Sequence, residues 1–406
     1  MKLLKIAIRN TKRNVRRTAI TIVTIVIGVF VIIFAGGVVK GFQNETIVNM
    51  IETRTGDIQI HKTGYRETLD ILPLDLSINF NDVLNGVSTA EGIKEISGRI
   101  FFSGQLVTQE ESTVLFGKAI DVAKELVICP RIKNQIFLGE FLSPEDKNAI
   151  VLTKDSYERL NINIGDTLLL FATSKEGAIN ATEMMLKGVF HSDLPDSSTK
   201  LGYVPLSTAQ DLLLMNGMVT EVVLKKEKNS DISEIVGEMK NIFSGYDFDI
   251  NTWEEIEQII LQMVERQGLL SIVVSVILFI IVFSTVMNTM LMVVLERTSE
   301  IGTLMAIGFK RMHILSLFVF EGAMKGLIGA ILGTVLGAMA VYIVNAIGIP
   351  FDKPGSKEVS YILRPEMDPK IIILAILFSL GAAVLASLYP ANRASKMDPV
   401  EALRSV

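Results

Sequence analysis

The sequence predicts an α-helical membrane protein with four transmembrane helices and a large extracytoplasmic α+β domain inserted between helices 1 and 2. Three observations support this fold class. The 406-residue chain is 49% hydrophobic and only 20% charged, which is less polar than a soluble protein of this size. Four apolar stretches are each long enough to cross a bilayer as a helix. Residues 41–266, of mixed composition, separate the first stretch from the other three.

The first apolar stretch follows a strongly basic start that contains no acidic residue. Its charges are Lys2, Lys5, Arg9, Lys12, Arg13, Arg16 and Arg17. We therefore predict a basic amphipathic helix over residues 1–17 and transmembrane helix 1 over residues 18–40, with the N-terminus in the cytoplasm. The apolar run is longer than the core of a secretory signal and no small-residue cleavage site closes it, so we expect it to be retained.

Residues 41–266 are predicted to form the extracytoplasmic domain, with a helix at each end. Thr252 and Glu255 have the spacing of a capping box, which marks the start of the second end helix. Both end helices run into the membrane segments without proline, so we expect a rigid two-helix stalk; surface helices on flexible turns are the alternative. Between them, β-branched and apolar runs predict strands at 57–62, 105–108, 113–117, 150–153, 167–172, 184–190 and 220–224. Helical pieces are predicted at 155–160, 208–215 and 232–243.

Transmembrane helix 2 is predicted over residues 267–295, and a patterned cytoplasmic loop follows over 296–311. The charged residues of this loop come first: Glu296, Arg297 and Glu300. Its apolar residues recur at helical spacing: Ile301, Leu304 and Met305. This pattern predicts a short helix with an exposed apolar ridge, ended by Gly308. Such a ridge suits docking into a groove on a partner protein; a helix lying on the membrane is the alternative.

Transmembrane helices 3 and 4 are predicted over residues 312–347 and 371–392, with an extracytoplasmic loop over 348–370 and a cytoplasmic tail over 393–406. Helix 3 carries five glycines near one face: Gly322, Gly326, Gly329, Gly333 and Gly337. Small residues at this spacing let helices approach closely, either within the chain or between subunits. Glu321 and Lys325 lie four residues apart and are expected to form an intrahelical ion pair near the cytoplasmic interface.

Motifs for catalysis and for metal binding are absent from the sequence. There is no G-x-x-x-x-G-K-[ST] loop, no G-x-S-x-G and no H-E-x-x-H. The single cysteine, Cys129, excludes an intrachain disulfide and a cysteine-based zinc site. His191 has Asp193 and Asp196 nearby, but a solvated loop explains this cluster better than a site does. We expect no catalytic residue, no metal and no cofactor in this chain, which is therefore not an enzyme.

Two stretches carry a family resemblance. Residues 296–308 read E-R-T-x-E-I-G-T-L-x-A-I-G, and residues 389–404 read Y-P-A-x-R-A-x-x-x-D-P-V-E-A-L-R. Both resemble the permeases of the MacB/FtsX/Lol superfamily of ABC transporters, as do the basic start and the order of one span, a domain and three spans. Residues 55–65 and 161–170 look like the Lol branch, so the chain is most similar to the lipoprotein-releasing LolC/LolE-type permeases.

The resemblance implies a mechanism called mechanotransmission. Two permease protomers, identical or different, would pair, and each would dock a cytoplasmic ABC ATPase through residues 296–308. The ATPase would bind ATP and Mg, and its cycle would drive lipoproteins out of the inner membrane toward a periplasmic carrier. MacB itself carries its ATPase at the N-terminus, so this chain is expected to need a separate ATPase subunit. It would be a multi-pass protein of the cell inner (cytoplasmic) membrane, with a periplasmic domain and both termini in the cytoplasm.

Lipid tails would enter laterally through a cleft between transmembrane helices 1 and 2 of paired protomers. The residues expected to line it are Val26, Val29, Phe30, Ile33, Ile272, Ser275, Phe279 and Val282. Two other functions stay open: an efflux or export permease for another amphiphile or peptide, and an FtsX-like signalling subunit that transports nothing. Membrane lipid is an expected partner, and nucleic acid is not.

Overall fold

The computed structural model describes residues 15–191, 200–352, 360–398 and 402, and the chain divides into two compact units. One unit comprises Met1–Glu45, Gln262–Phe351 and Tyr361–Val406, and we call it the membrane unit. The other comprises Thr46–Leu261 and Asp352–Ser360, and we call it the outer domain. Most of the predicted amphipathic helix over 1–17, most of the tail after residue 398, and Asp193 and Asp196 lie outside the described residues.

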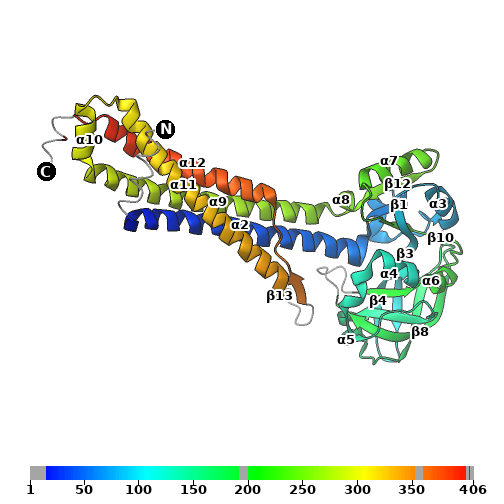
Figure 1. Ribbon diagram of the computed structural model, residues 1–406. Coiled ribbons are helices and arrows are strands. Elements are labelled where there is room, and N and C mark those ends of the chain that lie inside the picture. Colours follow the sequence, from blue (N-terminus) through cyan, green and yellow to red (C-terminus); the bar gives the residue numbers. More distant parts are fainter. Residues whose placement is uncertain (1–14, 192–199, 353–359, 399–401, 403–406) are drawn as a thin grey trace. The chain divides into compact units, whose positions relative to one another are not determined.

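Four helices of the described chain are long and apolar enough to cross a membrane, which confirms the four predicted spans (Figure 1). They are α2 (Val15–Met50), α9 (Gln258–Glu296), α11 (Arg311–Ile347) and α12 (Pro369–Ser395). α12 begins at a defined cap, because the Asp368 carboxylate accepts the Lys370 N–H at 2.8 Å and Pro369 occupies the first helical position. The short helix α10 (Thr298–Ala306) connects α9 to α11. Strands β13 (Ile349–Asp352) and β14 (Ser360–Leu363) pair between α11 and α12, where we predicted only a loop.

The glycine face of α11 packs against two neighbouring helices. Gly322 and Gly326 face α12, whereas Gly329, Gly333 and Gly337 face α2. A Cβ atom on Gly333 would lie 2.7 Å from Val29 Cβ, well inside van der Waals contact. The absence of side chains therefore allows three helices to approach one another. These glycines therefore allow close helix packing within one chain, which was the first of the two predicted alternatives.

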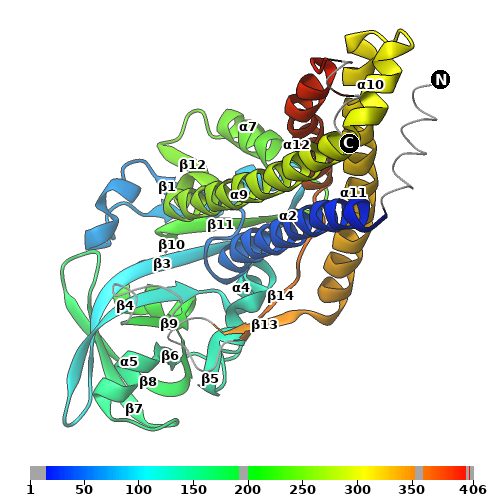
Figure 2. The same ribbon diagram turned by 90° about the vertical axis from the view of Figure 1, so that its left-hand side faces the viewer.

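The outer domain is built on a ten-stranded sheet (Figure 2). Its strands are β1 (Ile58–Lys62), β3 (Ile93–Val107), β4 (Ser112–Ile120), β5 (Ile136–Gly139), β6 (Ala149–Thr153), β7 (Thr167–Thr173), β8 (Ile179–Phe190), β9 (Leu201–Pro205), β11 (Glu221–Lys226) and β12 (Phe248–Thr252). Their order is β12-β1-β11-β3-β4-β9-β6-β8-β5, and β7 pairs with both β3 and β8. The pairing of β7 closes β3, β4, β9, β6, β8 and β7 into a barrel, from which β11, β1 and β12 extend.

Helices and short segments cover this sheet. They are the π-helical turn η1 (Ile51–Thr55), the 3₁₀ segments η2 (Arg66–Ile71) and η3 (Pro130–Gln135), and helices α3 (Phe80–Val87), α4 (Val122–Ile128), α5 (Lys154–Leu160), α6 (Leu206–Leu213), α7 (Ile232–Ile242) and α8 (Trp253–Ile256). A small sheet pairs β2 (Ile78–Asn79) with β10 (Met218–Val219). The strands alternate as a half-buried sheet should: in β7, Leu168, Leu170 and Ala172 enter the core, while Leu169 faces outward.

Every predicted strand and internal helix of the domain has a counterpart in the structure, but the second stalk helix does not have the predicted form. The capping box of Thr252 and Glu255 is present, yet α8 ends at Ile256. Glu257 takes a non-helical conformation (φ −109°, ψ 49°), and α9 begins at the next residue. The Arg66 Nη2 atom lies 3.3 Å from the Glu255 carbonyl oxygen and 3.4 Å from that of Ile256. This guanidinium occupies acceptors that a continuing helix would use, so the predicted unbroken helix is wrong here.

Candidate functional site

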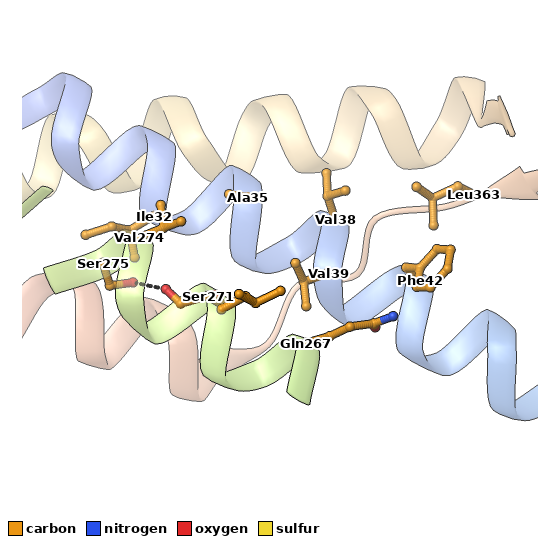
Figure 3. Close-up of a pocket in the computed structure, with 11 residues that line it drawn as sticks. Ile32, Ala35, Val38, Val39, Phe42, Gln267, Ser271, Val274, Ser275 and Leu363 are labelled. Carbon is orange, nitrogen blue, oxygen red and sulfur yellow. Dashed lines mark hydrogen bonds between the residues drawn. The ribbon is translucent and has the colours of Figure 1, made fainter. Parts of the chain in front are cut away.

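An apolar cavity of about 350 Å³ lies between α2 and α9 within the membrane unit (Figure 3). Its lining residues are Ile32, Ala35, Val38, Val39 and Phe42 of α2, Gln267, Leu270, Ser271, Val274 and Ser275 of α9, and Leu363 of β14. The volume is within the range of small-ligand pockets. The hydroxyl of Ser275 donates to the Ser271 carbonyl oxygen at 2.9 Å, so its one hydrogen-bond donor is used within its own helix. The lining is therefore suited to a hydrocarbon chain.

Contacts on either side of the cavity explain why it forms at this place. At Gly28 the two helices meet, because a Cβ atom there would lie 2.9 Å from Val282 Cγ2. In the other direction along the helices, Gln43 Nε2 donates to the Val264 carbonyl oxygen at 2.9 Å. Between these contacts, small side chains such as Ala35 and Ser271 leave space. The cavity is thus a gap between two fixed crossing points of the same helix pair.

The predicted cleft residues are only partly at this cavity. Ser275 lines it. Val29, Ile33 and Val282 are 1%, 2% and 5% exposed and belong to the core of the helix bundle. They pack against Gly333, Gly337 and Gly28, so the prediction that they line a cleft is corrected.

The other predicted cleft residues lie elsewhere on the two helices. Phe279 packs against Phe378 of α12, with ring centroids 5.1 Å apart, and Ile272 is 59% exposed on the outer side of α9. Val26 and Phe30 are half-buried, and their carbonyl oxygens lie near the glycine face of α11. Contact of these four residues with a substrate stays a prediction. Apolar periodicity could not locate the gap; the small residues opposite one another on α2 and α9 were the better signal.

The loop helix α10 ends as predicted but presents a different face. Gly308 has φ +94°, its N–H donates to Met305 O at 3.0 Å, and the Phe309 N–H donates to Leu304 O at 3.1 Å. These two bonds form a Schellman cap. Ile301 is 2% exposed, and Leu304 and Met305 pack against the bundle core. The predicted ridge is therefore not an exposed surface: Ile301 is buried, and Leu304 and Met305 are partly buried against the core of the helix bundle.

A different set of residues in α10 and at its C-terminal cap is accessible. Ser299, Thr303 and Ile307 are exposed, and Ile307 is 70% exposed, a high value for an isoleucine. The role of the loop in binding a partner stays a prediction, as does the role of Glu300. If the loop does bind a partner, Ile307 is its accessible apolar contact.

The charged residues at the start of the loop bind other helices of the bundle. Glu296 forms an ion pair with Arg17 of α2. Arg297 is 4% exposed, and its Nη1 atom lies 3.7 Å from Glu321 Oε2 of α11. Glu321 also pairs with Lys325 at 2.9 Å, which confirms the predicted intrahelical pair. Glu296 and Arg297 thus tie the loop to α2 and α11.

Among the described residues, no three histidine, cysteine or acidic side chains are grouped as metal ligands would be. The contacts described above are apolar packing, hydrogen bonds and ion pairs.

Two family models match the chain. The FtsX-like permease C-terminal model matches residues 272–399, and the MacB-like periplasmic core domain model matches residues 18–242. These matches cover both the last three spans and most of the outer domain.

Curated relatives agree with these families. An uncharacterized ABC transporter permease of Methanocaldococcus jannaschii is 23% identical over 274 residues, covering 66% of this chain and 64% of its own. The macrolide export ATP-binding/permease protein MacB of Campylobacter jejuni is 24% identical over 414 residues, covering 98% of this chain and 60% of its own. The lipoprotein-releasing system transmembrane protein LolC of Neisseria meningitidis is 21% identical over 426 residues, covering 98% of this chain and 97% of its own. This chain thus spans less than two thirds of the length of the first two relatives.

Proposed function

This chain belongs to the MacB/FtsX/Lol superfamily of ABC transporter permeases, and we propose that it takes an acylated substrate out of the membrane in an ATP-driven complex. The favoured substrate is a lipoprotein, which the complex would pass to a periplasmic carrier. The observation that carries this proposal is the apolar cavity between α2 and α9, which could receive an acyl chain.

The energetics explain why such a cavity and an ATPase would work together. Moving a hydrocarbon chain from lipid to water costs about 0.8 kcal/mol per CH₂ group, so extracting one acyl chain costs on the order of 10 kcal/mol. Lipid is itself apolar, so the cavity gains little affinity over the bilayer. Its contribution is to keep the chain away from water while the polar part of the substrate is withdrawn. The remaining work requires an external energy source, which ATP supplies in this family.

The proposed complex contains two permease protomers, identical or different, and a cytoplasmic ABC ATPase. ATP and Mg would be bound by the ATPase and not by this chain. The docking contact would be made by the exposed side of α10, including Ile307. The protein would lie in the cell inner membrane, with its basic N-terminus and its C-terminus in the cytoplasm and the outer domain in the periplasm.

The comparisons favour two substrates. The alignment with LolC extends over nearly the full length of both chains and supports lipoprotein release. The alignment with MacB covers as much of this chain and supports export of another amphiphile or a peptide as the second candidate.

Photo-crosslinking at neighbouring positions of α9 tests the proposal in cells. A photoreactive residue in place of Val274 would point into the cavity, whereas one in place of Val273, which is 55% exposed and does not line it, is the matched control. We expect lipoprotein adducts at Val274 and few at Val273. Adducts with another amphiphile or a peptide at Val274 would favour the second candidate. Equal labelling by bulk lipid at both positions would contradict a substrate role for the cavity.

A further inference from the structure

The end of helix α2 is held in the outer domain by side-chain donors that bind the last carbonyl oxygens after the helix. The helix passes into the π-helical turn η1, which ends at Gly56. Gly56 has φ +67°, and a Cβ atom at this position would lie 2.4 Å from Val223 Cγ2. Both the backbone conformation and the close contact require glycine. The last carbonyl groups of a helix have no partner within the helix and need one from elsewhere. Here Arg54 O accepts hydrogen bonds from Arg99 Nη1 at 2.8 Å and from Lys118 Nζ at 3.4 Å. Thr55 O accepts one from Gln59 Nε2 at 2.9 Å.

The two cations belong to a buried ion network. Arg99 is fully buried, and its Nη2 and Nε atoms bind the two oxygens of Glu125 at 2.7 and 2.9 Å. Its Nη1 atom also binds Glu221 Oε1 at 2.7 Å. Lys118 lies 3.4 Å from Glu125 Oε1. We call Arg99, Lys118, Glu125 and Glu221 the helix-end clamp; they come from β3, β4, α4 and β11, so the clamp joins three strands and a helix to the end of α2.

The charge of Arg99 keeps the two carboxylates of the clamp ionised. Burial alone would raise the pKa of Glu221, but the charge of Arg99 and a hydrogen bond from His61 bring that pKa to about 2. Burial likewise opposes ionisation of Glu125, and Arg99 and Lys118 overcome it, so the pKa of Glu125 is also lowered. Burial and the charge of Arg99 lower the pKa of Lys118, so the guanidinium of Arg99 is the main charge that faces the two carboxylates. His61 contacts this set through Glu221.

Stability alone does not explain such a network. Buried ion pairs are often no more stabilising than apolar residues of the same volume. Apolar residues, however, could not hold a helix carbonyl group in a fixed direction. A guanidinium can, because its rigid fork of five N–H donors reaches Glu125, Glu221 and Arg54 O at once.

The chain segment that leaves the outer domain is bound beside the clamp. Arg54 pairs with Glu257 at 3.2 Å, directly before α9 begins. The Trp253 N–H donates to Asp57 O at 3.1 Å, and β1 pairs with β12 from Ile58 opposite Thr252. Glu52 of η1 pairs with Arg131 at 2.9 Å. The end of α2 and the segment before α9 are thereby tied to each other through Arg54 and Glu257.

We propose that the helix-end clamp makes the sheet of the outer domain follow the end of α2, so that movement of this helix is passed to the domain. The inference rests on the proposed function, because it assigns to Arg99 a positioning role in coupling ATP hydrolysis to substrate release. Arg99 acts by holding Arg54 O and not by touching substrate.

Hydrogen exchange of the full chain, assembled with its ATPase partner, tests the clamp independently of transport. The variant Arg99→Lys keeps the charge but loses the fork, which gives a better chance of folding than Arg99→Met. The control Leu186→Ala removes a fully buried side chain of β8, away from the clamp. The readout is the exchange rate of residues 51–56 relative to that of residues 232–242, which form α7 and contain neither substitution. We expect this ratio to rise about tenfold in Arg99→Lys, through the loss of charged hydrogen bonds, and to stay near one in Leu186→Ala.

The second readout is the amount of substrate released per ATP hydrolysed. Arg99→Lys should hydrolyse ATP but release severalfold less substrate per ATP, whereas Leu186→Ala should keep the wild-type ratio. An unchanged exchange ratio in Arg99→Lys, or a raised ratio with normal release per ATP, would overturn the proposal. If the wild-type complex releases no substrate, the proposed function fails, and the coupling role of the clamp fails with it. The exchange ratio would still decide whether Arg99 holds the helix end.

Discussion

Replacing Gly333 with alanine tests the packing of α11 against α2. The added Cβ would lie 2.7 Å from Val29 Cβ and 2.8 Å from the Val26 carbonyl oxygen, whereas ordinary carbon contacts begin near 3.5 Å. The helices must therefore separate by several tenths of an ångström along a face that includes three glycines. Overpacking of this kind costs about 1–3 kcal/mol. Alanine also favours the helix by about 1 kcal/mol over glycine, which offsets part of this cost.

Gly381 provides the matched control, because it lies in α12 and a Cβ there would meet no atom within 4 Å. Gly381→Ala has the same gain in helix propensity without the clash, so the difference between the two variants isolates the steric cost. Thermal unfolding of the purified full chain in detergent measures it. At about 2–4 °C per kcal/mol, we expect Gly333→Ala to unfold several degrees below Gly381→Ala. Equal unfolding temperatures would refute the assignment of Gly333 to this contact.

Three further predictions concern the outer domain and α10. The pKa of Glu221 is about 2 in the folded protein against an ordinary value of 4.5, so its stabilisation of about 3 kcal/mol is complete above pH 4.5 and is lost as the pH falls toward 2. Denaturant unfolding across this pH range should show the loss, and Glu221→Gln should flatten the profile. Burial raises the pKa of the Cys129 thiol to about 11, so a thiol-alkylating reagent should label it only after unfolding; rapid native labelling would contradict its burial. Ile307→Asp should reduce co-purification of the ATPase at least tenfold without lowering the unfolding temperature. Ile301→Asp, which places a charge in the core, should impair folding itself. Unchanged co-purification of the ATPase with Ile307→Asp would exclude Ile307 as a docking contact.

The sequence was sufficient to predict the four spans and the helices and strands of the outer domain along the chain, because both depend on local patterns. A long charge-free run has few alternatives to a membrane helix. Alternation in residues 57–62 and the apolar run at 167–172 led to strands β1 and β7. β7 has one side in the core, whereas β1 is buried on both sides. The closure of the barrel could not be predicted, because it depends on β7 pairing with β3, which lies far away in the chain.

The sites were harder to predict, because they depend on which face of a helix meets which neighbour. The apolar ridge at Ile301 is compatible both with an exposed docking surface and with core packing, and only the tertiary contacts decide between them. The cleft residues were placed around Val29 because the whole run is apolar, and no local pattern shows where two helices separate. The clamp was missed because Arg99, Glu125 and Glu221 are distant in sequence, and each alone resembles an ordinary charged residue.

Depletion of this protein in its own cell tests the central claim most directly. Inner and outer membranes would be separated, and several lipoproteins would be followed by quantitative mass spectrometry, with wild-type and Ile307→Asp chains returned to the depleted cells. The account predicts that lipoproteins destined for the outer membrane accumulate in the inner membrane, and that only the wild-type chain restores their transfer. Normal lipoprotein sorting after depletion would contradict lipoprotein release and leave export of another amphiphile or a peptide as the better assignment.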